Sequence, residues 1–156
     1  MTASSLAPIL ERHPFCKGMR PEAIELMAGC AENLRYADGE VLFRANSPAE
    51  HSFLLRAGRV SMVMHGAGHG SVLIETAEEG ELVGWSWLFL PYQWHFDAVA
   101  VGPVRAIRVD GNCMRRKCEA DPAFGYDLVK RILYQAQQRL ERSRMQAMDL
   151  YRGGDR

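Results

Sequence analysis

Between Asp38 and Val109 the chain alternates short apolar runs with turn-forming residues, and this alternation limits the folds open to it. Turn signals such as Asp38-Gly39 and Glu79-Gly80 separate the runs. The runs cover residues 41–43, 53–55, 60–64, 72–76, 82–83, 96–101 and 104–109. Short strands spaced by roughly 8–12 residues are typical of an all-β sandwich or barrel, and not of alternating strands and helices. Residues 38–110 are therefore predicted to form a mainly β unit.

The segment before this unit has a helical pattern. Ser5 can cap a short helix that ends at His13-Pro14-Phe15, and Pro21 occupies the first-turn position that proline favours in a second helix. Apolar residues then recur at helical spacing as far as Leu34. Residues 1–36 are therefore predicted to be helical.

The segment after the β unit, residues 121–151, is predicted to be one long helix. Asp121 can cap it, and Pro122 fits its first turn. About 28 residues, each rising by roughly 1.5 Å, make a rod of about 42 Å, which is more than a domain of this size can cover. We therefore expect its apolar stripe to pack against the same helix of a second subunit in a homodimer. The stripe consists of Val129, Ile132, Leu133, Ala136 and Leu140.

Composition and charge exclude some classes of partner. Residues 1–156 have the length of a single domain, and 19 Lys and Arg balance 19 Asp and Glu. Nucleic-acid-binding proteins usually carry a basic excess, and the chain ends too soon after the long helix for a winged helix-turn-helix, so no direct DNA binding is expected. No apolar run approaches the roughly 20 residues that span a bilayer, and no export signal is visible. A cytoplasmic protein without membrane contact is predicted.

The thiols and imidazoles do not indicate a metal site. In the absence of an export signal, all the cysteines are expected to be reduced, and Cys113 and Cys118 lack a second pair at metal-like spacing. His65 and His69 lie in a glycine-rich turn where nothing orients them or completes a ligand set. No metal or other cofactor is predicted, although the sequence does not exclude haem. The cysteines are Cys16, Cys30, Cys113 and Cys118.

Several short motifs follow one another in a specific order along the chain. They are His13-Pro14-Phe15, Gly18-Met19, Gly39-Glu40-Val41-Leu42-Phe43, residues 53–63 (FLLRAGRVSMV) and Gly80-Glu81-Leu82-Val83-Gly84. This order resembles the effector domain of the cyclic nucleotide-binding superfamily, which includes the catabolite activator and FNR-type bacterial regulators. The resemblance implies a β-roll with N-terminal helices and a long C-terminal helix. It also implies a strand–glycine–strand hairpin at residues 53–63, with Gly39, Gly58 and Gly80 at positive φ.

The resemblance further implies a ligand site, from which this chain departs. In the family, the start of a cassette helix binds the cyclic phosphate, a Glu binds the ribose and an Arg pairs with the phosphate. Aligning Gly84 with the family's cassette glycine puts Trp85 and Ser86 where the Glu and its neighbour lie, and Trp94 and His95 where the Arg and its neighbour lie. An indole has one donor and no charge, so it cannot replace a guanidinium–phosphate pair. Weak or no binding of cAMP is expected.

The aromatic residues around this site allow three interpretations. They can line a pocket for a flat or hydrophobic ligand with His95 as polar anchor, fill a vacated nucleotide site, or form a patch for a protein partner. We prefer the pocket, because polar residues lie among the rings. The six aromatic residues are Trp85, Trp87, Phe89, Tyr92, Trp94 and Phe96. The candidate ligand-binding residues are Gly84, Trp85, Ser86, Trp87, Trp94 and His95.

The terminal helix and the basic run before it give no second site. Arg139 and Leu140 fall where the family has a polar base-reading pair, and they do not match it. Residues 115–117 and the basic residues of the helix, Arg139 among them, alternate with acidic ones and are predicted to be solvated.

The predicted function is therefore a non-enzymatic module that senses a small molecule and acts through a regulatory protein partner. No nucleophile–base pair or metal set that would indicate an enzyme is visible in the sequence. The alternative is a protein-interaction adaptor whose pocket is closed and holds no ligand.

Overall fold

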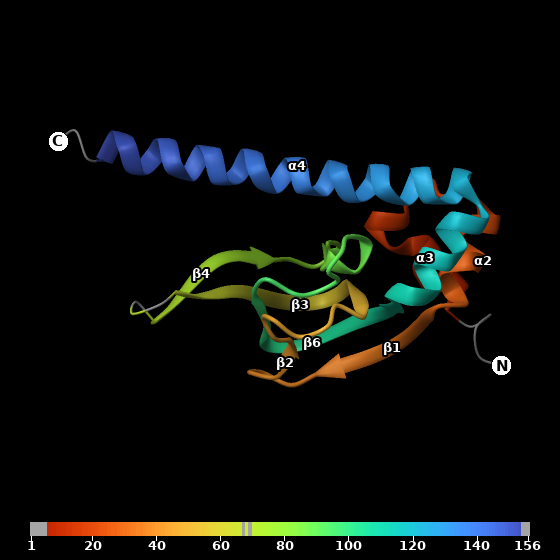
Figure 1. The fold of residues 1–156 in the computed structure, drawn as a ribbon, viewed down its shortest axis with the longest axis horizontal. Helices are drawn as coiled ribbons and strands as arrows, with labels where there is room; N and C mark the ends of the chain where they lie inside the picture. The colour runs from red at the N-terminus through yellow and green to blue at the C-terminus, as the bar shows by residue number, and fades with distance from the viewer. Residues whose placement is uncertain (1–5, 67, 69, 154–156) are drawn as a thin grey trace.

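The computed structural model describes residues 6–66, 68 and 70–153. An antiparallel six-stranded sheet lies at its centre, with short helices at the N-terminal end and a long helix at the C-terminal end (Figure 1). The β-roll predicted from the sequence is thereby confirmed. The strands are β1 (Ala31–Tyr36), β2 (Val41–Phe43), β3 (His51–Gly66), β4 (Gly70–Ala77), β5 (Leu82–Val83) and β6 (Asp97–Asp110). The helices are α1 (Ala7–Arg12), η2 (Pro14–Cys16), α2 (Pro21–Ala28), η3 (Ser86–Leu88), α3 (Gly111–Ala120) and α4 (Pro122–Gly153).

Two long strands organise the sheet. β6 pairs with β3 along most of its length, and β1 and β4 lie outside them in the order β1-β6-β3-β4. β2 adds to β6 and β5 adds to β3. The inward-facing side chains of β3 and β6, such as Leu54, Val60 and Ile107, are fully buried and form the middle of the core.

The prediction of a hairpin at residues 53–63 is wrong, because β3 continues through Gly58 as a single strand. The register with β6 shifts on both sides of Ala57, so Gly58 lies at a bulge with φ of 90°. A Cβ at this position would lie 2.3 Å from the carbonyl oxygen of Pro103, which leaves room only for glycine. The runs 96–101 and 104–109 likewise join into β6 across Gly102. Glycine occurs both at a bulge within a long strand and at a turn between two short strands. The glycine alone therefore does not distinguish the two.

Among the described residues, the predicted helical character of residues 1–36 holds for α1, η2 and α2, and no further than Ala28. α2 ends there, and residues 31–36 form β1, in register with Val104 to Val109 of β6. Their helical spacing was misleading because backbone pairing with a distant strand outweighs a short local pattern. Pro21 does open α2. The residue before α1 is Leu6, with no side-chain cap, and Ser5 lies outside the described residues.

The expectation that all the cysteines are reduced is also wrong. Cys30 and Cys113 form a disulfide, and their Cα atoms are 5.7 Å apart. These residues are 83 positions apart in the chain, so their proximity follows from the tertiary fold and not from local spacing. Cys16 and Cys118 are free thiols.

The predicted C-terminal helix is present as α4, and Asp121 accepts a hydrogen bond at its start from the backbone N–H of Phe124. α3, which precedes it, was not predicted. The first half of α4 packs on the core through Phe124, Leu128 and Ile132. Beyond residue 140 the helix extends along and past the sheet with its apolar side chains exposed (Figure 1). No helix in the described part of the chain is long and apolar enough to cross a membrane.

Candidate functional site

The segment between β5 and β6 corresponds to the expected cassette. Gly84 turns the chain out of β5 with φ of 88°, and η3 follows immediately. A Cβ on Gly84 would lie 2.6 Å from the Trp94 ring, so glycine is required here for both backbone and packing reasons. η3 is a single 3-10 turn.

Two of the predicted ligand-binding tryptophans lie in the protein core. Trp94 is 2% exposed and stacks on Phe43 with a ring-centroid separation of 3.7 Å. Trp87 is 1% exposed, and its indole N–H donates to the Ser52 hydroxyl, which in turn donates to the Gly84 carbonyl. For these two rings the filled-core interpretation is correct, because their faces are already covered by protein.

His95 lies apart from the other candidate residues. Gly84, Trp85 and Ser86 line a cavity that is described below, whereas the side chain of His95 is exposed and does not line it. Phe89 is also exposed, so the aromatic residues do not act as one unit. Of the six candidate residues, the structure brings Gly84, Trp85 and Ser86 together along one cavity.

These three residues form one wall of a cavity of about 260 Å³ between the roll and α4. Typical small-molecule sites measure roughly 300–1,000 Å³, so this cavity is a small one. Its other walls come from β3, β4, the residue before β6 and α4. The remaining lining residues are Met62, Ile74, Glu75, Phe96, Ala136, Arg139, Leu140 and Ser143.

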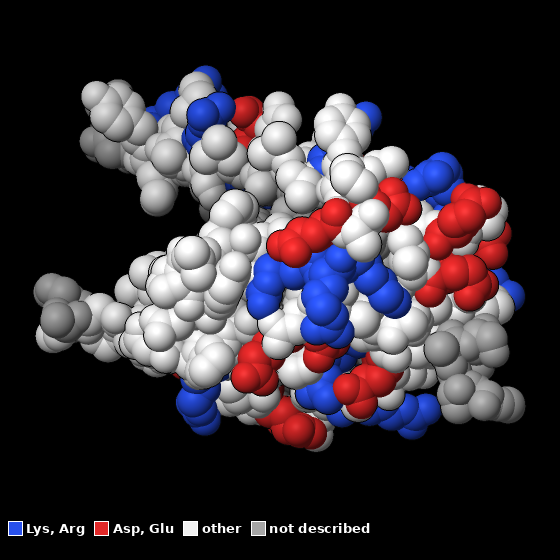
Figure 2. All heavy atoms as spheres, turned by 45° about the vertical axis from the view of Figure 1, so that its right-hand side comes forward, with Lys and Arg blue, Asp and Glu red and all other residues white. Residues whose placement is uncertain are grey.

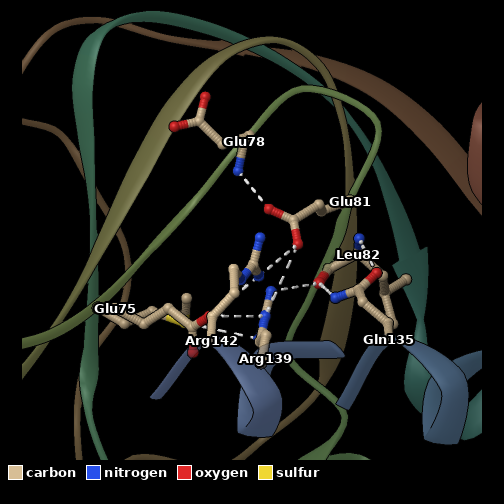
Figure 3. A network of polar contacts seen from close by, with 8 residues as sticks. Glu75, Glu78, Glu81, Leu82, Gln135, Arg139 and Arg142 are labelled. Atoms are coloured by element: carbon tan, nitrogen blue, oxygen red, sulfur yellow. Dashed lines mark hydrogen bonds and ion pairs between the residues drawn. The ribbon is translucent and has the colours of Figure 1, made fainter. Parts of the chain in front are cut away.

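Gln135 holds α4 to the edge of the roll. Its side-chain amide donates to the carbonyl of Leu82 at 2.7 Å and accepts from the N–H of the same residue at 2.8 Å (Figure 3). The amide thus completes the backbone pairing of β5 as a neighbouring strand would. Arg139, one helical turn further on, donates to the same carbonyl at 3.0 Å. The position of α4 over the cassette is therefore fixed by polar contacts as well as by packing.

Arg139 is the principal charge of the cavity. It is 8% exposed, and its guanidinium lies 5.2 Å from the ring centroid of Trp85. Its Nε lies 3.5 Å from Glu75 and 3.9 Å from Glu81, within ion-pair range but without a hydrogen bond. Burial lowers the pKa of Arg139, and the two carboxylates oppose this effect. The group stays charged, as arginine does in proteins.

Arg142 completes a network with two positive and two negative charges. Its Nη2 lies 3.2 Å from Glu75 and 3.2 Å from Glu81 (Figure 3). Glu81 also accepts from the backbone N–H of Glu78. Because the charges balance, the cavity wall offers no net positive charge to an anionic ligand.

The prediction that Arg139 belongs to a solvated basic face is wrong. Residues 128, 132, 135 and 139 follow one another at steps of three or four along α4, which places Arg139 on the same face as the buried Leu128 and Ile132. That spacing was visible in the sequence and could have identified Arg139 as a buried charge. The carboxylates opposite it could not have been found in this way, since they come from β4 and the turn before β5.

Two of the three residues of the basic run in α3 are likewise engaged in the fold. Arg115 lies 4.1 Å from the ring centroid of Tyr92 and donates to the carbonyl of Trp87, and Lys117 donates to the carbonyl of Leu26. On the face shown in Figure 2, acidic side chains border the basic ones. This face is therefore not a continuous basic surface of the kind that binds nucleic acid.

His65 takes part in a local hydrogen-bond chain. Its Nε2 lies 2.7 Å from Asp97, and its Nδ1 lies 3.2 Å from the hydroxyl of Ser71. The backbone N–H of Ala45, followed by His65, lowers the pKa of Asp97. His69, the other imidazole considered as a ligand, lies outside the described residues. Among the residues that the structure describes, no three His, Cys, Asp or Glu gather in a group that could hold a metal ion.

The roll, the glycine-led segment after β5 and the covering helix together define a β-roll domain with a small cavity under its C-terminal helix. The family profile of the cyclic nucleotide-binding domain matches residues 33–121, which is more than half of the chain. The chain therefore belongs to the cyclic nucleotide-binding domain family. Proteins with this domain are mostly regulatory sensors. Among curated proteins, no sequence matches the chain.

Solved structures give the same fold. A putative cyclic nucleotide-binding protein of Geobacter metallireducens GS-15 is 24% identical with a TM-score of 0.75, covering 90% of this chain and 98% of that one. The sensor domain of the transcriptional regulator DNR of Pseudomonas aeruginosa is 16% identical, with a TM-score of 0.70 and coverage of 89% and 93%. A cAMP-binding acyltransferase of Mycobacterium smegmatis is 25% identical with a TM-score of 0.66, and the match covers 83% of this chain but 40% of the acyltransferase.

Proposed function

We propose that this chain is a non-enzymatic regulatory module that senses a small molecule other than cAMP and acts through a protein partner. The observation that carries the proposal is the cavity beside Trp85. The family's fold is kept around it, but its positive charge, Arg139, is already paired within the protein. Arg139 is balanced by Glu75 and Glu81. A cyclic phosphate would have to compete with these carboxylates.

The contacts that the family uses for a cyclic nucleotide are also replaced. Trp85 stands where the ribose-binding Glu is expected, and Trp94, where the phosphate-binding Arg is expected, is stacked in the core. The cavity that remains is lined mainly by apolar side chains, which favours a small, uncharged ligand.

A second function is supported by the exposed surface of the cassette. Phe89 is 64% exposed and Leu90 is 80% exposed, next to the buried Trp87. Apolar side chains at an exposed loop tip are a feature of protein-interaction sites. If the cavity holds no ligand, the chain would be an adaptor that binds a partner through this loop.

Our first prediction is that cAMP and cGMP bind weakly or not at all. Loss of the charge-assisted phosphate contact lowers affinity by orders of magnitude. Isothermal titration calorimetry with both nucleotides measures this directly. A dissociation constant in the micromolar range or below for either nucleotide would contradict the prediction.

Whether the module is a sensor or an adaptor can be tested on the same protein. Small molecules extracted from cells should raise the melting temperature and change the tryptophan fluorescence of a sensor, because a ligand that binds only the folded state stabilises it. Ala136→Met should abolish both effects by filling the cavity, whereas the exposed Gln137→Met should not. An adaptor would show neither effect in any variant.

A homodimer through α4 is a further part of the proposal. Val129 is 45% exposed and Leu133 is 64% exposed, while Ile132 is 5% exposed. Of the stripe predicted from the sequence, Ile132 therefore belongs to the core of the protomer and is not available to a partner. Ala136 and Leu140 line the cavity.

The far half of α4 and the β3–β4 hairpin diverge (Figures 1 and 2), and both carry exposed apolar side chains that a second copy could cover. They are Met64, Val72, Leu73, Met145, Met148 and Leu150.

Our second prediction is that Val129→Glu combined with Leu133→Glu gives a folded monomer, because like charges would face each other across the interface. Sedimentation velocity of the variant and of wild type measures the change. Gln138→Glu is the control, since this exposed residue lies on the opposite side of α4 from Val129. Wild type that is already monomeric at about tens of micromolar, a typical range for a moderate interface, would refute the dimer.

A further inference from the structure

The disulfide between Cys30 and Cys113 joins two parts of the fold that are otherwise in limited contact. Cys30 lies between α2 and β1, and Cys113 lies in the first turn of α3. Two hydrogen bonds accompany it: Lys117 donates to the carbonyl of Leu26 at 2.7 Å, and Asp110 donates its N–H to the carbonyl of Cys30 at 2.9 Å. The disulfide is the only covalent link at this junction in the part of the chain that the structure describes.

The surroundings of this disulfide favour exchange with thiols. Cys113 is partly exposed, whereas Cys30 is 8% exposed. Cys113 is the third residue of the ten-residue α3, and Arg115, Arg116 and Lys117 follow it. A helix start and neighbouring cations stabilise a thiolate, and labile cysteines are found in such partly exposed, electropositive places. Asp110, which accepts from the N–H of Cys113, opposes this effect at the helix start.

The two free thiols are poorly suited to the same chemistry. Burial raises the pKa of Cys16 to about 12. Burial, followed by Glu119 and Asp121, also raises the pKa of Cys118. Both shifts disfavour the thiolate, so these two cysteines are less suited to exchange than the disulfide.

The position of α3 links the disulfide to the rest of the site. Arg115 donates to the carbonyl of Trp87 in the cassette. At the other end of α3, a Cβ on Gly125 of α4 would lie 3.1 Å from the Cβ of Cys118, so the two helices are in close contact. A change in the freedom of α3 would therefore reach both the cassette and the first turns of α4.

We propose that Cys30–Cys113 is a thiol–disulfide exchange site through which thiol reductants control the mobility of α3 and the start of α4. A thiolate of the reductant attacks the sulfur of Cys113, the less buried of the two cysteines, the S–S bond breaks, and Cys30 leaves as a thiolate that takes up a proton. A second thiol then attacks the mixed disulfide, releases Cys113 and leaves the reductant oxidised as its own disulfide. Two electrons pass from two reductant thiols to the protein.

The test compares oxidised and reduced protein by hydrogen exchange. Millimolar reduced glutathione or a dithiol should open the disulfide of folded protein, seen by gel shift with a maleimide as a rise from two reactive thiols to four after denaturation. Amide protection should then fall by about tenfold or more in α3 and the first turns of α4, with β3 and β6 unchanged. Cys118→Ser is the matched control, because it removes a thiol of α3 and keeps the disulfide.

The double variant Cys30→Ser/Cys113→Ser should reproduce the exchange pattern of the reduced protein without any reductant. Three results would overturn the proposal. The disulfide could resist both reductants in the folded protein, reduction could remove protection from β3 and β6 together with α3, or protection could be the same in both states. Failure of the double variant to fold would also overturn it, since the bond would then be a structural requirement and not a switch.

Discussion

Replacing Trp94 with Ala should lower the free energy of unfolding by roughly 3–5 kcal/mol, the usual cost of removing a large buried aromatic side chain. Trp94 is 2% exposed, stacks on Phe43, and lies against Gly84, where a Cβ would come within 2.6 Å of its ring. The truncated site cannot collapse easily, because the backbone of Trp94 is held by hydrogen bonds to Ser47 and Asn46. Urea denaturation of wild type and variant measures the difference.

Phe89→Ala is the matched control for this experiment. Phe89 belongs to the same aromatic cluster but is 64% exposed, so its loss should change the free energy of unfolding by less than about 1 kcal/mol. If Trp94→Ala were as mild as Phe89→Ala, Trp94 would not be part of a packed core. The interpretation of Trp94 as an open wall of a ligand pocket would then regain support.

The second large effect is expected for Arg139→Met. This change removes the buried partner of Glu75 and Glu81 and keeps much of the side-chain volume. Breaking a buried ion pair by removing one partner costs about 3–5 kcal/mol, because a charge is left without compensation. Both carboxylates are partly exposed and keep Arg142, so we expect a loss of roughly 3 kcal/mol, at the lower end of this range.

Arg142→Met tests whether burial decides the size of this effect. Arg142 contacts the same two carboxylates, but about half of its side chain is exposed. Exposed ion pairs contribute about 0–1 kcal/mol, so the free energy of unfolding should hardly change. The contribution of Arg142 to the free energy of unfolding should also depend more on salt than that of Arg139. Chemical denaturation at low and at high salt measures this difference. Equal losses for the two variants would mean that the network acts as a surface feature.

Parts of the candidate site could be predicted from local pattern. Gly84, Trp85 and Ser86 line the cavity as expected, since a glycine-led turn after a short strand has a recognisable sequence. Trp87, Trp94 and His95 were predicted with them but lie elsewhere, two in the core and one at the surface. The direction in which an aromatic side chain points depends on how the loop folds back, which no spacing rule predicts for irregular backbone.

The β-roll, the turns at residues 38–39 and 79–80, and the long terminal helix with its cap at Asp121 could all be predicted from the sequence. These features depend on backbone conformation and on the periodicity of burial, which are local properties. The tertiary structure alone decided that β3 and β6 run unbroken through their bulges and that Cys30 meets Cys113. It also decided that Arg139 lies buried between Glu75 and Glu81. Each of these features depends on contacts between segments that are distant in the chain. The residues next to each segment in the sequence do not predict such contacts.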